Sequence, residues 1–254
     1  SDQIKLSQLR MEMKTKGIDA YLVNQTDEYQ NEFLPSYSRR LTWLTNFSGS
    51  AGEAIITRNK AYLFVDGRYT LQAKIEVNEK LYSIYNYNKK SPQDILNTLK
   101  LKKVNYAIDG NIVTARKLKF IKSEVKKNIS IKLLTKNLID IIWKSRPKVP
   151  KSNVWHHEDK FHGTKVSSKI VTIKKIIKQD KADYLFITSN ESICWLLNLR
   201  GGDLTYTPIF MSRLIIDKYG NCYLFADIKN PIKFPKEINL SIIKPKFFNK
   251  FLSE

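Results

Sequence analysis

Apolar and polar positions recur along the chain with two different periods. Residues 4–16 place apolar side chains mostly on one face of a helix, which ends at Gly17. Residues 20–23 form a short apolar run that is typical of a buried strand. Residues 53–57 and 61–65 are two further apolar runs, and the three polar residues between them predict a β-hairpin.

The same two patterns continue to residue 225. The expected strands are 81–85, 106–108, 129–134, 184–187, 214–216 and 223–225. The expected helices are 92–99, capped by Ser91, and 114–127, 138–143, 166–179 and 192–197. Strands that alternate with helices predict an α/β fold in which a mixed β-sheet is flanked by helices.

Two glycine turns frame the predicted hairpin. Gly49 and Gly52 precede its first strand, where glycine permits a positive φ or a close approach of the backbone. Asp66 and Gly67 follow its second strand, and a helical pattern begins directly after Arg68. We expect Asp66 to cap the entry turn of that helix, and Asp66 and Arg68 to be structural residues of the turn.

Residues 144–153 hold two prolines and four cations without an apolar period, which is typical of a linker. The order of helix, strand, helical segment and hairpin partly repeats after it. We therefore expect a duplicated architecture with one domain at residues 1–145 and a second at residues 146–254. The second copy is expected to be cut short, because the chain ends soon after Ile243, where another strand and helix would follow.

A net charge of +20 and a pI of about 9.7 raise nucleic acid as a partner. The 44 cations are 35 lysines and 9 arginines, and the lysines are spread from Lys5 to Lys250. Arginine is the residue suited to bidentate phosphate and base contacts, so its scarcity disfavours a nucleic-acid binder.

The two cysteines, Cys194 and Cys222, lie in apolar surroundings typical of buried thiols, and they give no disulfide framework. The amino terminus lacks the apolar core of a signal peptide, and no apolar run approaches the roughly 18 residues needed to span a bilayer. We expect a soluble, cytoplasmic protein without a membrane partner.

The sequence offers no convincing catalytic set. His156, His157 and His162 are the only histidines, but adjacent histidines point apart on a regular backbone and no cysteine ligand is near. We interpret them as part of an exposed loop, with no metal ligand among them. Nucleophile-elbow, phosphate-loop and dinucleotide glycine motifs are all missing from the sequence.

One polar group stands out at Arg200 and Asp203, which follow an apolar helical segment. Gly201 and Gly202 lie between them, and two glycines would let the chain reverse and hold Arg200 on a tight turn. Arg200 could then bind a carboxylate of a peptide or of another domain at a substrate rim. The alternative is that Arg200 and Asp203 neutralise each other and the carboxyl end of the helix.

Four runs carry a resemblance that covers nearly the whole chain. They are GSAGEAIIT at 49–57, VDGRYTLQA at 65–73, NLIDIIWKSRP at 137–147 and WLLNLRGGDLTYTPIF at 195–210. In this order they resemble the amino-terminal half of the long, three-domain form of Xaa-Pro aminopeptidase, also called aminopeptidase P. The resemblance implies two creatinase/prolidase N-terminal-type domains, each a mixed β-sheet flanked by helices.

In that family a third, carboxy-terminal pita-bread domain binds two divalent metals, usually manganese, through two Asp, one His and two Glu. The metals activate a water that attacks the bond before a penultimate proline. No histidine follows His162 here, so the motifs of that domain are missing. We therefore expect no catalytic residue, metal ligand or cofactor in this chain, and no peptide hydrolysis by the chain alone.

The resemblance also implies partners. In an intact enzyme these domains would contribute to dimerisation and wall the entrance of the active site, with the catalytic domain as partner and proline-containing peptides as indirect ones. The isolated chain is expected to be a monomer or a weak dimer. Three alternatives stay open: a stand-alone peptide-binding module that uses Arg200, a degenerate truncated product without activity, and, disfavoured by composition, a basic nucleic-acid binder.

Overall fold

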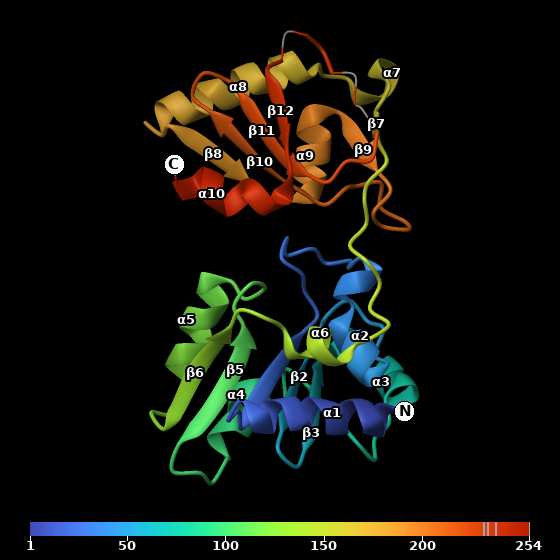
Figure 1. The fold of residues 1–254 in the computed structure, drawn as a ribbon, viewed down its shortest axis with the longest axis vertical. Helices are drawn as coiled ribbons and strands as arrows, with labels where there is room; N and C mark the ends of the chain where they lie inside the picture. The colour runs from blue at the N-terminus through green and yellow to red at the C-terminus, as the bar shows by residue number, and fades with distance from the viewer. Residues whose placement is uncertain (231, 233, 237, 254) are drawn as a thin grey trace. The chain divides into compact units, whose positions relative to one another are not determined.

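The computed structural model describes residues 1–253 except 231, 233 and 237 (Figure 1). The chain divides into two compact units. Unit 1 comprises residues 1–28 and 32–147, and unit 2 comprises residues 29–31 and 148–254.

Unit 1 is built on a six-stranded sheet in the order β4-β3-β2-β1-β5-β6. Its strands are β1 (Ala20–Asn24), β2 (Gly52–Thr57), β3 (Ala61–Val65), β4 (Ser83–Asn86), β5 (Val104–Asp109) and β6 (Ile129–Leu134). β2 is antiparallel to both of its neighbours, and the other pairs are parallel, so the sheet is mixed as predicted. In the central pair, Ala20 lies opposite Thr57.

Helices cover both faces of this sheet, because apolar side chains alternate along its strands. One core lies under α1 (Asp2–Thr15), α2 (Arg40–Thr45), α3 (Thr70–Glu76) and α6 (Leu138–Ile142). The opposite core lies under α4 (Pro92–Asn97) and α5 (Ala115–Glu124). Two short 3-10 helices, η1 (Ser36–Ser38) and η2 (Gly67–Tyr69), precede α2 and α3.

Unit 2 has a four-stranded sheet in the order β12-β11-β10-β8. Its strands are β8 (Tyr184–Ile187), β10 (Ser212–Asp217), β11 (Cys222–Ala226) and β12 (Leu240–Ile243). A separate two-stranded sheet pairs β7 (Val154–His156) with β9 (Leu199–Gly201). The helices are α7 (Asp159–His162), α8 (Val166–Gln179), α9 (Asn190–Leu197), η3 (Pro245–Phe247) and α10 (Phe248–Ser253).

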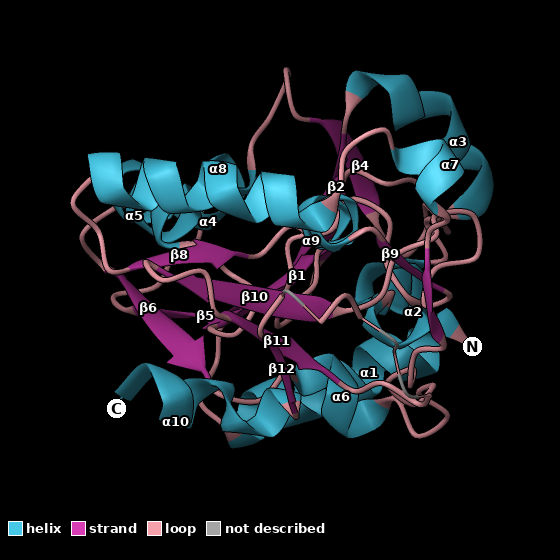
Figure 2. Ribbon diagram, turned by 90° about the horizontal axis from the view of Figure 1, so that it is seen from above, coloured by secondary structure: helices cyan, strands magenta, loops and turns pink. Residues whose placement is uncertain are grey.

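Figure 2 shows α8 and α10 on opposite sides of β10, β11 and β12. The face under α8 and α9 carries the buried aliphatic core of the unit. On the other face, Phe248 and Phe251 of α10 contact the rings of Phe186, Tyr223 and Phe225. Each face of the sheet is therefore covered, which is what alternating apolar positions along a strand require.

The predicted repeat is confirmed for four strands of each sheet. In unit 1, β1, β2 and β3 form an antiparallel meander and β4 returns parallel to β3. In unit 2, β8, β10 and β11 form the same meander and β12 returns parallel to β11. In the described part of unit 2 no strand pairs with the outer side of β8, where unit 1 has β5 and β6 beyond β1.

Several elements depart from the predictions. The expectation that no helix follows Ile243 is wrong, because η3 and α10 lie there. The sequence pattern also missed α2, β7, β9 and β12, which have three to six residues and are too short to show a period. In contrast, Ser91 caps α4 as predicted, and Asp94 completes a capping box with it.

None of the helices in the described residues is long and apolar enough to cross a membrane.

Candidate functional site

Arg200 lies on a strand, and the prediction of a tight turn at this position is wrong. Residues 199–201 are extended as β9 and pair with β7, so that Arg200 lies opposite Trp155. The chain reverses earlier, at Asn198, which ends α9 with a left-handed φ of 50°. Asparagine tolerates this conformation, and the two glycines that follow are therefore not needed for the reversal.

The guanidinium of Arg200 donates hydrogen bonds to backbone carbonyl groups at the carboxyl end of α9. Its Nη1 donates to the carbonyl oxygens of Cys194 (3.2 Å) and Leu199 (2.8 Å). Carbonyls at a helix carboxyl end lack partners and carry a partial negative charge, so a cation at this point is stabilising. Of these two carbonyls only that of Cys194 belongs to α9, and it also accepts from the backbone N–H of Asn198, so Arg200 adds a second hydrogen bond at the helix end.

Asp203 has a different set of partners. Its carboxylate accepts hydrogen bonds from the Ser152 hydroxyl (2.5 Å) and from the Met211 backbone N–H (2.7 Å). In the described part of the chain no ion pair within 4 Å joins Asp203 to Arg200, so the expected mutual neutralisation is not found. Asp203 instead holds together the segments that enter β7 and β10.

Gly201 is required by packing rather than by a turn. A Cβ atom at this position would lie 2.5 Å from Cβ of Phe210 and 3.0 Å from the carbonyl oxygen of Ile209. Gly202 has open space around the equivalent position, with nothing within 4 Å. The two neighbouring glycines therefore have different roles, and only Gly201 lets a second segment approach β9 closely.

Next to Arg200 lies a buried cation, Lys169 of α8, which is 5% exposed. Its Nζ donates to the carbonyl oxygen of Trp195 and to Oδ1 of Asn198 (2.5 Å), and lies 4.2 Å from the centre of the Trp195 ring. Burial, and secondarily the charge of Arg200, lower the pKa of Lys169. Sequence reasoning missed this residue, although a lysine on the apolar face of a helix was a usable signal.

Two exposed indole rings border this group. Trp155 is 46% exposed and Trp195 is 59% exposed. Trp155 lies directly opposite Arg200 in the β7–β9 pair, so their side chains point to the same face. The Nε and Nη2 atoms of Arg200 donate to no group in the residues that the structure describes. We call Trp155, Trp195, Lys169 and Arg200 the Arg200 surface; it combines free guanidinium donors with apolar rings.

His156 and His162 lie on regular elements, so the prediction of a loop is wrong for these two, whereas His157 lies between the elements. His156 ends β7, with its Nδ1 3.1 Å from the carbonyl oxygen of Asn198, and His162 ends α7. Their ring centres are 6.1 Å apart. Burial, and then Arg200, lower the pKa of His157. Within the described residues, no three His, Cys, Asp or Glu side chains gather closely enough to hold a metal ion.

In unit 1 the glycine motif is a packing site around Phe47. A Cβ atom at Gly49 would lie 2.3 Å from the Phe47 ring, and one at Gly52 would lie 2.8 Å from it. Both glycines therefore allow the predicted close approach, and neither has a positive φ. The ring of Phe47 also meets Tyr69 edge to face, with centres 5.7 Å apart.

The second turn of unit 1 is structural, as predicted. Oδ1 of Asp66 accepts hydrogen bonds from both the backbone N–H and Nε of Arg68, each at 2.9 Å, and thereby caps η2. These hydrogen bonds lower the pKa of Asp66. Gly67 has a negative φ, and a Cβ there would lie 3.2 Å from the side-chain amide of Asn86.

Both cysteines are buried, as the sequence predicts. Burial raises the pKa of Cys194 to about 11 and that of Cys222 to about 12. A thiol with such a pKa remains protonated at neutral pH and is a poor nucleophile.

Comparison with known families decides what these two units are. The model of the creatinase/prolidase N-terminal domain matches residues 5–140, and a second model with the same description matches residues 145–246. The chain belongs to the creatinase/prolidase N-terminal domain family. Its two family domains correspond to two α/β units that share a strand order, which is the fold that the resemblance implied.

The relatives are aminopeptidases of greater length. The chain is 33% identical to a probable Xaa-Pro aminopeptidase P of Laccaria bicolor over 84% of its own length and 34% of that protein. It is 32% identical to Xaa-Pro aminopeptidase 1 of Dictyostelium discoideum over 88% of its own length and 37% of the relative. The chain thus spans about a third of the curated relatives that it matches, and it is an N-terminal region of the Xaa-Pro aminopeptidase type.

A solved structure shows the same fold. X-prolyl aminopeptidase from Caenorhabditis elegans, described as a cytosolic enzyme with a di-nuclear active site, is 24% identical to this chain with a TM-score of 0.86. The match covers all of this chain and 44% of that enzyme.

Proposed function

We propose that this chain is the non-catalytic N-terminal region of a Xaa-Pro aminopeptidase, in which it limits access to an active site carried by another part of the protein. One observation carries the proposal. Two N-terminal family domains account for nearly the whole chain, while the aligned region makes up only 34% of the Laccaria relative and 37% of the Dictyostelium relative. The chemistry of the parent enzyme, two divalent metals that activate a water, would belong to the remaining part.

The Arg200 surface is the part of unit 2 that we assign to the substrate rim. An extended peptide offers carboxylates and proline rings, and an arginine with free donors beside two indoles binds both kinds of group. Asp203, which the sequence suggested as a second rim residue, is occupied by Ser152 and Met211 and has a structural role in this proposal. Trp155 takes its place.

Peptidase assays test the main proposal. The purified chain with Mn²⁺ should release no amino-terminal residue from an Xaa-Pro tripeptide. A chimera that carries this chain in place of the N-terminal region of the Dictyostelium relative should release it. Metal-dependent release by the 254-residue chain alone would overturn the proposal, and so would a folded chimera with no activity.

The rim assignment has its own test in that chimera. Trp155→Ala should lower kcat/KM about tenfold for a long peptide and much less for a tripeptide, because a rim contacts only extended substrates. Tyr184→Ala, which removes an exposed ring from β8 of unit 2, is the matched control. Equal effects of the two substitutions would contradict the assignment.

The second candidate function is a stand-alone peptide-binding module. It is favoured by the same free guanidinium donors of Arg200, which need no catalytic domain to bind a carboxylate. Calorimetry of the chain with a proline-containing peptide tests it; binding lost in Arg200→Lys would support it, and no heat of binding would dismiss it.

Assembly and location complete the proposal. We propose a monomer or weak dimer for the isolated chain, with dimerisation depending largely on the catalytic part of the longer relatives, so light scattering should give a mass near 29.6 kDa. A tight dimer at low concentration would contradict this. We propose a cytoplasmic location because the Caenorhabditis elegans relative is described as cytosolic.

A further inference from the structure

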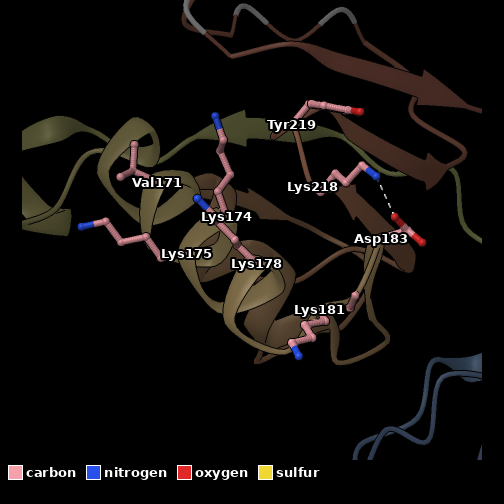
Figure 3. A pocket seen from close by; sticks show the side chains of 9 residues that line it. Val171, Lys174, Lys175, Lys178, Lys181, Asp183, Lys218 and Tyr219 are labelled. Carbon is pink, nitrogen blue, oxygen red and sulfur yellow. Dashed lines mark hydrogen bonds and ion pairs between the residues drawn. The ribbon is translucent and has the colours of Figure 1, made fainter.

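A groove in unit 2, which shares helix α8 with the Arg200 surface, is lined mainly by lysines (Figure 3). It lies between the carboxyl half of α8 and the turn that joins β10 to β11, and its volume is about 620 Å³. Its lining residues are Val171, Lys174, Lys175, Lys178, Lys181, Ala182, Asp183, Lys218 and Tyr219. We call it the lysine groove.

The charge of this groove is largely uncompensated. Asp183 is its single carboxylate and already pairs with Lys218 at 2.8 Å. The four lysines of α8 and its carboxyl-terminal turn have no carboxylate within 4 Å in the part of the chain that the structure describes. Figure 3 shows Lys174 and Lys178 directed to the same side of α8, with Lys218 turned to Asp183.

The spacing of these lysines opposes helix stability. Lys174 and Lys178 are four residues apart on α8, where like charges repel each other. The helix dipole favours only Lys178, which lies in the last turn. Lys181 follows the helix with a left-handed φ of 52°, a position at which glycine is the unstrained choice. A bound anion would reduce the repulsion between Lys174 and Lys178. It would also account for a lysine at position 181, where the backbone is strained.

The opposite wall is a preformed turn. Asp217 accepts hydrogen bonds from the backbone N–H groups of Tyr219 and Asn221, each at 2.9 Å. Gly220 has a φ of 95°, and a Cβ there would lie 2.8 Å from Cδ of Lys174, so glycine leaves room for that side chain. The turn also carries Tyr219, which is 71% exposed and whose ring centre lies 5.5 Å from Nζ of Lys218.

We propose that the lysine groove binds a compact polyphosphate anion. Lysine recognises phosphate as a point charge, and several lysines around one concavity suit a ligand with several negative charges in a small volume. A volume of 620 Å³ lies within the range of pockets for nucleotide-sized ligands. Five lysines line this one groove, an arrangement that suits a small anion better than an extended nucleic-acid strand. This site is independent of the aminopeptidase proposal.

Calorimetry on the 254-residue chain tests the site. Sodium triphosphate and ATP are titrated without Mg²⁺, in a phosphate-free buffer of fixed, low ionic strength. We expect saturable binding of at least one of them, and a loss of affinity of roughly tenfold or more in the double variant Lys174→Gln/Lys178→Gln, because two charge-assisted contacts are removed. Circular dichroism confirms that the variant is folded.

The matched control is Lys119→Gln/Lys122→Gln, which removes two exposed lysines from α5 of unit 1. It should bind as the unmodified chain does. Tyr219→Ala distinguishes a nucleotide from an inorganic polyphosphate as the ligand. A loss of affinity for ATP alone identifies a nucleotide, and an unchanged affinity for both ATP and triphosphate identifies the phosphate chain as the ligand. Binding of neither anion, equal losses in both lysine variants, or tighter binding of a 20-nucleotide single strand would overturn the proposal.

Discussion

At the residue scale, the two glycines beside Arg200 allow a test with an internal control. Gly201→Ala places a methyl group 2.5 Å from Phe210 and close to the backbone of Ile209, which cannot easily move. We expect it to lower the free energy of unfolding of unit 2 by about 1–3 kcal/mol. Gly202→Ala meets open space and should have almost no effect. Urea unfolding followed by fluorescence compares them, and similar midpoints for the two variants would contradict this role of Gly201.

Asp217 should make unit 2 sensitive to acid. Burial alone would raise the pKa of this carboxyl, but hydrogen bonds from the side chain and backbone of Asn221 and from the backbone N–H of Tyr219 lower it overall. Folding therefore favours the ionised form. The resulting stabilisation is complete above about pH 4 and is lost as the pH falls towards the lowered pKa of the folded state.

The measurement compares Asp217→Asn with the unmodified chain. The amide removes the charge, so the variant should be less stable than the unmodified chain at pH 7, and this difference in stability should shrink as the pH falls below about 4. Asp227→Asn changes an exposed carboxyl at the opposite end of the β10–β11 pair and serves as control. A deficit that does not depend on pH would show that the charge of Asp217 is irrelevant.

At the scale of elements, α10 is too short to be stable alone and depends on aromatic contacts with the sheet. The Phe251 ring lies 4.9 Å from that of Tyr223 and 5.3 Å from that of Phe225, centre to centre. We expect Phe251→Ala to destabilise unit 2 by about 1–3 kcal/mol, less than a fully buried phenylalanine would.

Leu252→Ala is the matched control for α10, because Leu252 is the next residue and is 58% exposed. It should change the unfolding free energy by less than about 0.5 kcal/mol. Thermal melts of both variants distinguish them. Equal melting temperatures would mean that α10 does not cover the sheet in solution.

At the scale of the whole molecule, unit 2 is not continuous in sequence, since it includes residues 29–31. Within the unit, Asn190 donates to Asn31 (3.2 Å), Asn31 donates to Sδ of Met211 (3.5 Å), and the Arg213 guanidinium lies 4.6 Å from the centre of the Tyr29 ring. These contacts involve buried groups, whose loss leaves polar atoms without partners.

A chain of residues 148–254 alone should therefore be less stable than the same unit in the full chain, by about 1–3 kcal/mol. The double variant Tyr29→Ala/Asn31→Ala of the full chain should show a loss of similar size. Because two units can unfold in separate steps, the transition of unit 2 must be resolved, for example by hydrogen exchange. Equal stability of residues 148–254 in both contexts would contradict this view.

Local patterns determined much of this protein from the sequence alone. The hairpin of β2 and β3, the capped start of α4 and the burial of both cysteines follow from neighbouring residues, because turn chemistry, capping and short apolar runs act within a few positions. The repeated order of elements likewise indicated the duplicated fold. These features need no knowledge of distant contacts.

Tertiary structure alone decided the candidate site. Arg200 is on a strand because residues 154–156 pair with residues 199–201, and a pairing between two three-residue segments leaves no period to detect. Asp203 is bonded to Ser152, and Lys169 to Asn198, because these contacts join segments more than 25 residues apart in the chain. Such contacts depend on how the elements pack, which no local pattern of the chain contains.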